Sequence, residues 1–165
     1  MSGLGTIAER VNAPATHPLV AVSLLPEGLA LLTSALASAG LPTDDVTAQG
    51  RCFYKFVAPS GTVVGYGGFE IYGAEVLLRS IAVLPSFRGT GAGRSAVHAL
   101  IEIAREKGAR RAYLLTTSAA GFFERLGFNR IERNEAPASI LNSEQAQNVC
   151  PGSAALLMRN LENWP

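Results

Sequence analysis

The spacing of apolar residues changes along the chain and separates strand-like from helix-like segments. Residues 19–25 form a short apolar run typical of a strand. After Pro26, apolar residues recur at the three-to-four-residue spacing of one helix face as far as Ala39, and Gly40 follows as a stop signal. The first part of the chain is therefore predicted to be a strand followed by an amphipathic helix. Residues 42–45 predict one further helical turn.

The middle of the chain loses the helical period. Residues 52–58, 62–71 and 75–83 are short runs rich in Val, Phe, Tyr and Ile, and turn-forming residues separate them. Such runs with short connections are typical of antiparallel strands joined by hairpins. We expect an antiparallel meander here.

The helical period returns after Gly91 and ends at Gly108. One stripe of this segment is apolar and the opposite stripe, which carries Arg94 and His98, is expected to face solvent. The apolar stripe consists of Val97, Leu100, Ile101 and Ala104. The remaining expected elements are a strand at 111–116, a short helix at 119–126, strands at 128–132 and 153–160, and an irregular or briefly helical stretch at 133–152.

This order of elements predicts an α/β (α+β) fold with a mixed, mostly antiparallel sheet of about seven strands and helices on both faces. A length of 165 residues fits one domain. We expect a loose N-terminal arm at 1–18 and a single domain at 19–165, because residues 1–18 lack periodicity and no linker divides the rest.

Composition narrows the function classes. The net charge of +1 and the absence of a long basic run argue against nucleic-acid binding. No apolar stretch reaches the ~20 residues that cross a bilayer, and residues 1–18 do not resemble a signal peptide, so we expect a soluble, cytoplasmic protein without a membrane partner. Cys52 and Cys150 lack metal-binding spacing, so we expect no metal and interpret both as buried small apolar residues. His17 and His98 are expected to be solvated.

Alternate glycines mark the most informative segment, Arg88-Gly89-Thr90-Gly91-Ala92-Gly93-Arg94, which joins a strand to a helix. Glycines let backbone N–H groups approach a ligand, and a helix N-terminus favours an anion, so this turn suits a phosphate. An ordinary flexible turn is the alternative. No lysine follows as a P-loop requires. The run 91–96 does match GxGxxA, but the preceding meander and the lack of a later acidic ribose ligand speak against a dinucleotide fold.

The same turn fits R/Q-x-x-G-x-G, the pyrophosphate motif of the GCN-five-related (GNAT) N-acetyltransferases. The strand ending Ile81-Ala82-Val83-Leu84-Pro85 and the helix ending Arg125-Leu126-Gly127-Phe128 also resemble that family. The resemblance covers roughly residues 19–160. Within the family, segments 78–83, 114–123 and 149–151 are most similar to arsenic-resistance N-acetyltransferases.

The resemblance implies an acetyl-CoA-dependent enzyme that needs no metal, in which a bulged strand splays away from its neighbour to admit the pantetheine arm. The residues that would bind the cofactor lie on that strand, the glycine turn and the short helix. They are Ile81, Ala82, Val83, Arg88, Gly89, Thr90, Gly91, Ala92, Gly93, Arg94, Ser95, Phe122 and Phe123. The expected partner is a small, amino-acid-like amine, with an organoarsenical as the finer form of this expectation, and a second copy of the chain in a homodimer is a further expected partner.

The catalytic residues of the family are not repeated. Phe123 stands where many relatives have a tyrosine acid, and Leu77 stands where many have a glutamate base. A two-residue turn at 73–74 would place Glu70 opposite Leu77 and diagonal to Arg79. Glu70 is then either a replacement base or the ion-pair partner of Arg79.

The sequence leaves two alternatives open, one for the role of residues 116–118 and one for catalysis as against simple binding of acyl-CoA. Thr116, Thr117 and Ser118 either cap the short helix or contact substrate. We expect direct acetyl transfer to the amine, since no activated nucleophile is recognisable. A non-catalytic acyl-CoA sensor is the alternative, because the usual tyrosine and glutamate are missing.

Overall fold

A seven-stranded sheet with the order β1-β2-β3-β4-β5-β7-β6 organises the computed structural model, which describes residues 18–149 and 152–165. Neighbouring strands are antiparallel except for β4 and β5, which are parallel. The strands are β1 (Val20–Ser23), β2 (Cys52–Val57), β3 (Val63–Tyr72), β4 (Glu75–Val83), β5 (Arg111–Thr116), β6 (Asn129–Ile131) and β7 (Ala155–Asn160). The predicted mixed, mostly antiparallel sheet is confirmed.

The α-helices of the described residues are α2 (Leu29–Ser38), α3 (Ala92–Glu106), α4 (Ala120–Arg125) and α5 (Ala138–Leu141). Short 3₁₀ turns lie at Pro26–Gly28, Pro85–Phe87 and Arg133–Glu135, and a π-helical turn at Gln145–Val149. The helical turn predicted at 42–45 is wrong: hydrogen-bonded turns without helix span 44–47. The arm predicted at 1–18, His17 and Cys150 lie outside the described residues, except for Pro18.

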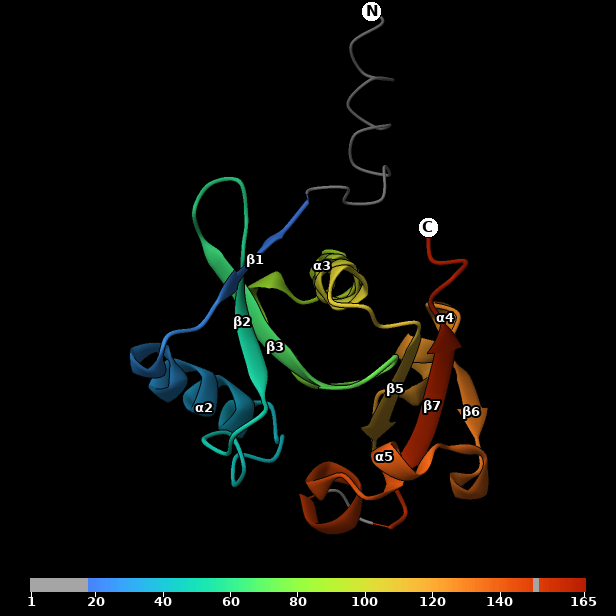
Figure 1. The fold of residues 1–165 in the computed structure, drawn as a ribbon. Helices are drawn as coiled ribbons and strands as arrows, with labels where there is room; N and C mark the ends of the chain where they lie inside the picture. Colours follow the sequence, from blue (N-terminus) through green and yellow to red (C-terminus); the bar gives the residue numbers. More distant parts are fainter. Residues whose placement is uncertain (1–17, 150–151) are drawn as a thin grey trace, which may run out of the picture.

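Helices cover both faces of the sheet, as expected (Figure 1). The apolar stripe of α3 and residues of α4 pack on one face in the largest core cluster. On the other face α2 packs through Leu32 and Leu36, and α5 through Ile140. Each amphipathic helix buries its apolar side against the sheet, which explains why the periodicity located the helices well.

Two expectations about side-chain exposure are wrong. His98 is half-buried and its ring lies 4.4 Å from that of Trp164, because the C-terminal segment folds back over α3. Burial, together with the charge of Arg94, lowers the pKa of His98 although Glu102 opposes the shift. Cys52 is half-buried rather than buried, since it begins β2 at the margin of the core.

The hairpin between β3 and β4 has the predicted register: Tyr72 pairs with Glu75, Glu70 with Leu77, and Gly68 with Arg79. Gly73 has φ +64° at the turn, a conformation that glycine adopts without a side-chain clash. Because alternate residues of a strand share a face, this register brings Glu70 and Arg79 to the same side of the sheet.

A bulge changes the register further along the same pair of strands. Tyr66 pairs with Ala82 and Gly68 with Arg79, so Ser80 and Ile81 together stand opposite Gly67. Ser80 has φ +57°, the left-handed conformation seen at bulged positions. Beyond the bulge β4 diverges from β5, and the two strands pair only at Glu75–Leu77 with Arg111–Tyr113. The splayed sheet implied by the resemblance is confirmed.

Candidate active site

The splay between β4 and β5 opens a cavity of about 260 Å³. Its walls come from the turn after α2, from the bulged part of β4, from the end of β5 and from the first residues of α4. They are Gly40, Leu41, Pro42, Leu78, Arg79, Ser80, Ile81, Leu114, Leu115, Thr116, Thr117, Ser118, Ala119, Phe123 and Gln145. A cavity at the divergence of two strands presents backbone groups of β4 that β5 does not pair with.

The end of β5 contributes hydroxyl groups to the cavity. Thr116 Oγ1 accepts hydrogen bonds from the backbone N–H of Ala119, at 2.9 Å, and of Ser118, at 3.4 Å. Thr116 therefore orders the turn before α4, but no side chain caps this helix, whose N-cap is Ala119, so the predicted capping role is wrong. Thr117 and Ser118 are exposed and line the cavity, so the interpretation that they contact a substrate stays a prediction.

The glycine turn lies beyond the end of β4 and leads into α3. Gly89 and Gly91 have φ +77° and +86°, which a residue with a side chain rarely adopts. Gly91 is the N-cap of α3 and no side chain caps this helix. The first N–H groups of a helix have no acceptor within it and carry partial positive charge. The turn thus has the backbone geometry for an anion.

Phe122 connects the glycine turn to α4. A Cβ on Gly93 would lie 3.2 Å from the Phe122 ring, so the absence of a side chain at Gly93 lets the ring approach the start of α3. Phe122 and Phe123 pack edge to face with ring centroids 4.9 Å apart. Phe123 is buried and lines the cavity, where the family resemblance had placed a tyrosine.

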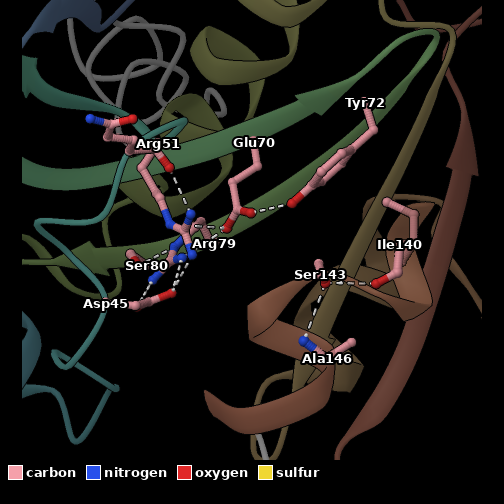
Figure 2. A network of polar contacts seen from close by, with 10 residues as sticks. Asp45, Arg51, Glu70, Tyr72, Arg79, Ser80, Ile140, Ser143 and Ala146 are labelled. Atoms are coloured by element: carbon pink, nitrogen blue, oxygen red, sulfur yellow. Dashed lines mark hydrogen bonds and ion pairs between the residues drawn. The ribbon is translucent and has the colours of Figure 1, made fainter. Parts of the chain in front are cut away.

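A buried cluster of charged residues lies beside the cavity, and Arg79 is its centre (Figure 2). The guanidinium donates to Asp45 from Nη1 and Nη2, at 2.6 and 2.5 Å, and to Glu70 Oε2 from Nη1, at 2.8 Å. Tyr72 donates a short hydrogen bond to Glu70 Oε1. Arg51 Nη2 lies 3.3 Å from Asp45 Oδ2. Two carboxylates and two guanidinium groups make the cluster neutral.

The cluster perturbs its members in opposite directions. Burial alone would raise the pKa of Asp45, but its hydrogen bonds and charge interactions with Arg79 and Arg51 outweigh burial and lower it. Burial and the neighbouring Glu70 carboxylate raise the pKa of Tyr72 to about 12. Asp45 is therefore held as a carboxylate and Tyr72 as a phenol.

The structure brings Glu70 and Arg79 together as the hairpin register predicted. Glu70 is only 2% exposed and is not among the residues that line the cavity. Its role as a base stays a prediction. The sequence did not reveal Asp45 and Arg51, because both lie in irregular chain between α2 and β2 and only folding brings them to β4. The sequence pattern indicated only a helical turn at 42–45 and gave no functional signal for either charge.

Comparison with known proteins identifies the family. The sequence profile of the Acetyltransferase (GNAT) family matches residues 32–128, more than half of the chain, and the chain belongs to this family.

Curated relatives match about half of the chain. An uncharacterized N-acetyltransferase of Chlorobaculum tepidum is 36% identical over 87 residues, 52% of this chain and 56% of that protein. An amino-acid acetyltransferase of Mycobacterium tuberculosis is 32% identical over 83 residues, 50% of this chain and 47% of that protein. The chain spans about half the length of these curated relatives.

Solved structures share the fold over most of the chain. A Mycobacterium tuberculosis protein in complex with CoA and NLQ has a TM-score of 0.68 at 21% identity, covering 86% of this chain and 99% of that one. Tetrahymena GCN5 has a TM-score of 0.70 at 14% identity, covering 88% and 98%. These similarities establish the GNAT fold.

Residues 18–149 and 152–165 contain neither a membrane-spanning helix nor a candidate metal site. No helix in this part of the chain is both long and apolar enough to cross a membrane. No group of three or more His, Cys, Asp or Glu residues there could hold a metal ion.

Proposed function

We propose that this protein transfers the acetyl group of acetyl-CoA to the amine of a small molecule. The observation that carries the proposal is the cavity at the splay of β4 and β5, next to a glycine turn at the N-terminus of α3. A cofactor with a pyrophosphate and an extended amide-bearing arm requires both features.

The two features match two parts of acetyl-CoA. The turn from Arg88 to Ser95 would bind the pyrophosphate through backbone N–H groups, and the backbone of Ile81–Val83 would pair with the pantetheine arm. Phe122 and Phe123 would lie along the cofactor. This assignment places the thioester in the cavity, within reach of an amine that enters beside Arg79 and Thr117.

The walls of the cavity favour a small acceptor without additional positive charges. Among the described residues that line it, no side chain is acidic, and the one charged residue, Arg79, is already paired with Asp45 and Glu70. A polyamine would bury its cationic groups there without partners, which is costly. Hydroxyl and amide groups of Thr117, Ser118 and Gln145 suit a polar, amino-acid-like amine. The related amino-acid acetyltransferase agrees with this class.

An organoarsenical amino acid is the finer form of this proposal. It rests on the similarity of segments 78–83, 114–123 and 149–151 to arsenic-resistance N-acetyltransferases. Such a compound carries the primary amine that acetylation would block. It is tested within the same acceptor panel.

The test combines acetyl-CoA binding with an acceptor screen. Calorimetry should detect acetyl-CoA binding, and release of the CoA thiol should report turnover with the twenty common L-amino acids, small monoamines, an arsinothricin-type amino acid and spermidine. We expect at least one amino-acid-like amine to be acetylated and spermidine to be inactive. Binding of acetyl-CoA without turnover of any amine would contradict the enzyme and support the sensor. The best substrate of the screen is called the reference amine below.

A further inference from the structure

The buried cluster connects the segment between α2 and β2 to the wall of the cavity. Asp45 lies three residues after Pro42, and the stretch Gly40–Pro42 forms one wall of the cavity. Arg79 forms part of the facing wall, on β4. The Asp45 carboxylate bonds to both terminal nitrogens of Arg79. A two-bond contact of this kind fixes orientation as well as distance.

Arg79 is in turn fixed from three strands. Glu70 of β3 accepts from Nη1, and the Phe53 ring of β2 lies 5.5 Å from the guanidinium carbon. On β4, Nε donates to the hydroxyl of Ser80, at 3.2 Å, and Ser80 is the bulged residue. Gly68 makes the arrangement possible, because a Cβ there would lie 2.4 Å from the Phe53 ring. The side chain of Arg79 is 0% exposed, so it has little freedom to move away.

The other end of the segment is also tied to the cluster. Arg51 Nη1 donates to the carbonyl of Gln49, at 2.7 Å, while Nη2 contacts Asp45. Apolar contacts hold this stretch as well: Val46 is buried in the cluster that α2 forms with the sheet, and Leu41 packs against it. The ionic contacts add a charged link that joins residues 40–51 to the cavity wall at Arg79.

We propose that Asp45 is a positioning residue for the acceptor: through Arg79 it fixes the wall Gly40–Pro42 against the bulge of β4, and so sets the space in which the amine binds. This inference rests on the proposed function. The cluster touches β4 at the bulged Ser80, before Ile81, and the glycine turn takes no part in it. We therefore expect Asp45 to affect amine binding rather than binding of the pyrophosphate. If the contact only stabilised the fold, its loss would weaken the binding of acetyl-CoA as well as the binding of the amine.

The test compares Asp45→Asn with Asp44→Asn, a neighbouring exposed aspartate outside the cluster. The asparagine keeps the size of Asp45 but removes the charge that pairs with Arg79. We expect Asp45→Asn to raise the KM of the reference amine about tenfold, while kcat and the Kd of acetyl-CoA stay within about twofold. Hydrogen exchange should accelerate in residues 40–51 and not in 88–95. Asp44→Asn should leave all four quantities unchanged, and Asp45→Glu should recover part of the KM.

The possible failures are distinguishable. If the unaltered protein acetylates no amine, the proposed function has failed, and this inference falls with it. If the unaltered protein is active and Asp45→Asn leaves the KM of the reference amine unchanged, the inference alone is wrong. An equal rise in the Kd of acetyl-CoA would also overturn it, because the effect would then not be confined to the acceptor side.

Discussion

The glycine turn and the buried cluster both involve the chain of β4, the turn beyond its end and the cluster at Arg79, but they are built in different ways. The turn is contiguous in sequence and exposed, and it is specified by backbone conformation at Gly89 and Gly91. The cluster is buried and specified by side-chain charges from three separate segments, with Asp45 and Arg79 thirty-four positions apart. A short run of residues can therefore specify an anion-binding turn, whereas a buried charged cluster requires side chains from several segments that the folded sheet brings together.

The two regions should also respond differently to mutation. An exposed backbone site can lose its ligand without loss of fold, because few native contacts depend on it. A buried neutral cluster cannot lose one member without leaving an unpaired charge. The following predictions test this contrast, beginning with the largest effect.

Replacing the centre of the cluster should have the largest effect on stability. Arg79→Met leaves Asp45 and Glu70 buried without their central cation, with only the contacts from Arg51 and Tyr72 remaining. We expect the free energy of unfolding to fall by about 3–5 kcal/mol at neutral pH. Arg111→Met is the matched control, since Arg111 pairs with Glu75 at the sheet surface and such pairs contribute at most about 1 kcal/mol. Urea denaturation of both variants measures the difference. Equal losses would contradict the contrast.

The difference in stability between Arg79→Met and the unaltered protein should depend on pH. In the unaltered protein the pKa of Asp45 is lowered, so its stabilising contribution is present above the unfolded value of about 3.9 and lost as the pH falls through the lower folded value. In Arg79→Met the contribution of Arg79 is lost, so the pKa of Asp45 rises relative to the unaltered protein although Arg51 still opposes the effect of burial. The stability gap between the two proteins should therefore narrow as the pH falls below about 4. A gap independent of pH would show that lost packing, not charge, causes the effect.

The glycine turn should lose its ligand while the fold survives. Acetyl-CoA at a hundredfold excess over Kd should stabilise the unaltered protein by about 2.7 kcal/mol, and Gly91→Glu should remove most of this gain. The N-terminus of α3 favours an anion because of its partial positive charge. The carboxylate of the new side chain would occupy that position and repel the pyrophosphate. Gly61→Glu is the control, because Gly61 has a similar φ of +88° in the turn between β2 and β3. A retained thermal shift in folded Gly91→Glu would exclude this turn as the cofactor site.

Glu70→Gln separates the two interpretations of Glu70. The carboxylate is buried and bonded to Arg79 and Tyr72, so we expect a stability loss of about 2 kcal/mol and a kcat/KM for the reference amine within tenfold of the original. A decrease of about 10²-fold or more, together with loss of the acidic limb of the pH profile, would instead identify Glu70 as the base. The measurement is kcat/KM against pH beside the melting temperature.

Phe123→Tyr should have the smallest effect. The residue lines the cavity where the family resemblance led us to expect a tyrosine acid, so the variant adds a hydroxyl there. We expect turnover within about tenfold, a change in the activation barrier below roughly 1.4 kcal/mol, because the proposed reaction does not use that group. Thiol release with the reference amine is the measurement. A much larger gain would show that protonation of the leaving thiolate limits the rate.

Local sequence by itself determined the elements and the candidate cofactor site. Strand alternation and helix periodicity act within a few residues, and α3 buries the predicted stripe. The hairpin register also followed from a two-residue turn, since such a turn leaves one pairing for Glu70 and Leu77. The glycine turn was visible because positive φ angles select glycine directly.

The ion pairs that Asp45 makes in the buried cluster depend on the tertiary structure and could not be predicted from the local sequence. Asp45 reaches Arg79, and Arg51 reaches Asp45, because α2 packs on the sheet and positions the segment that follows it, a consequence of contacts distant in sequence. His98 changed from an expected solvated residue to a partner of Trp164 for the same reason. Side-chain ion pairs and ring contacts have no fixed sequence separation, so no local pattern predicts them. Backbone conformation, in contrast, restricts which residues can adopt it and can therefore be predicted from the local sequence.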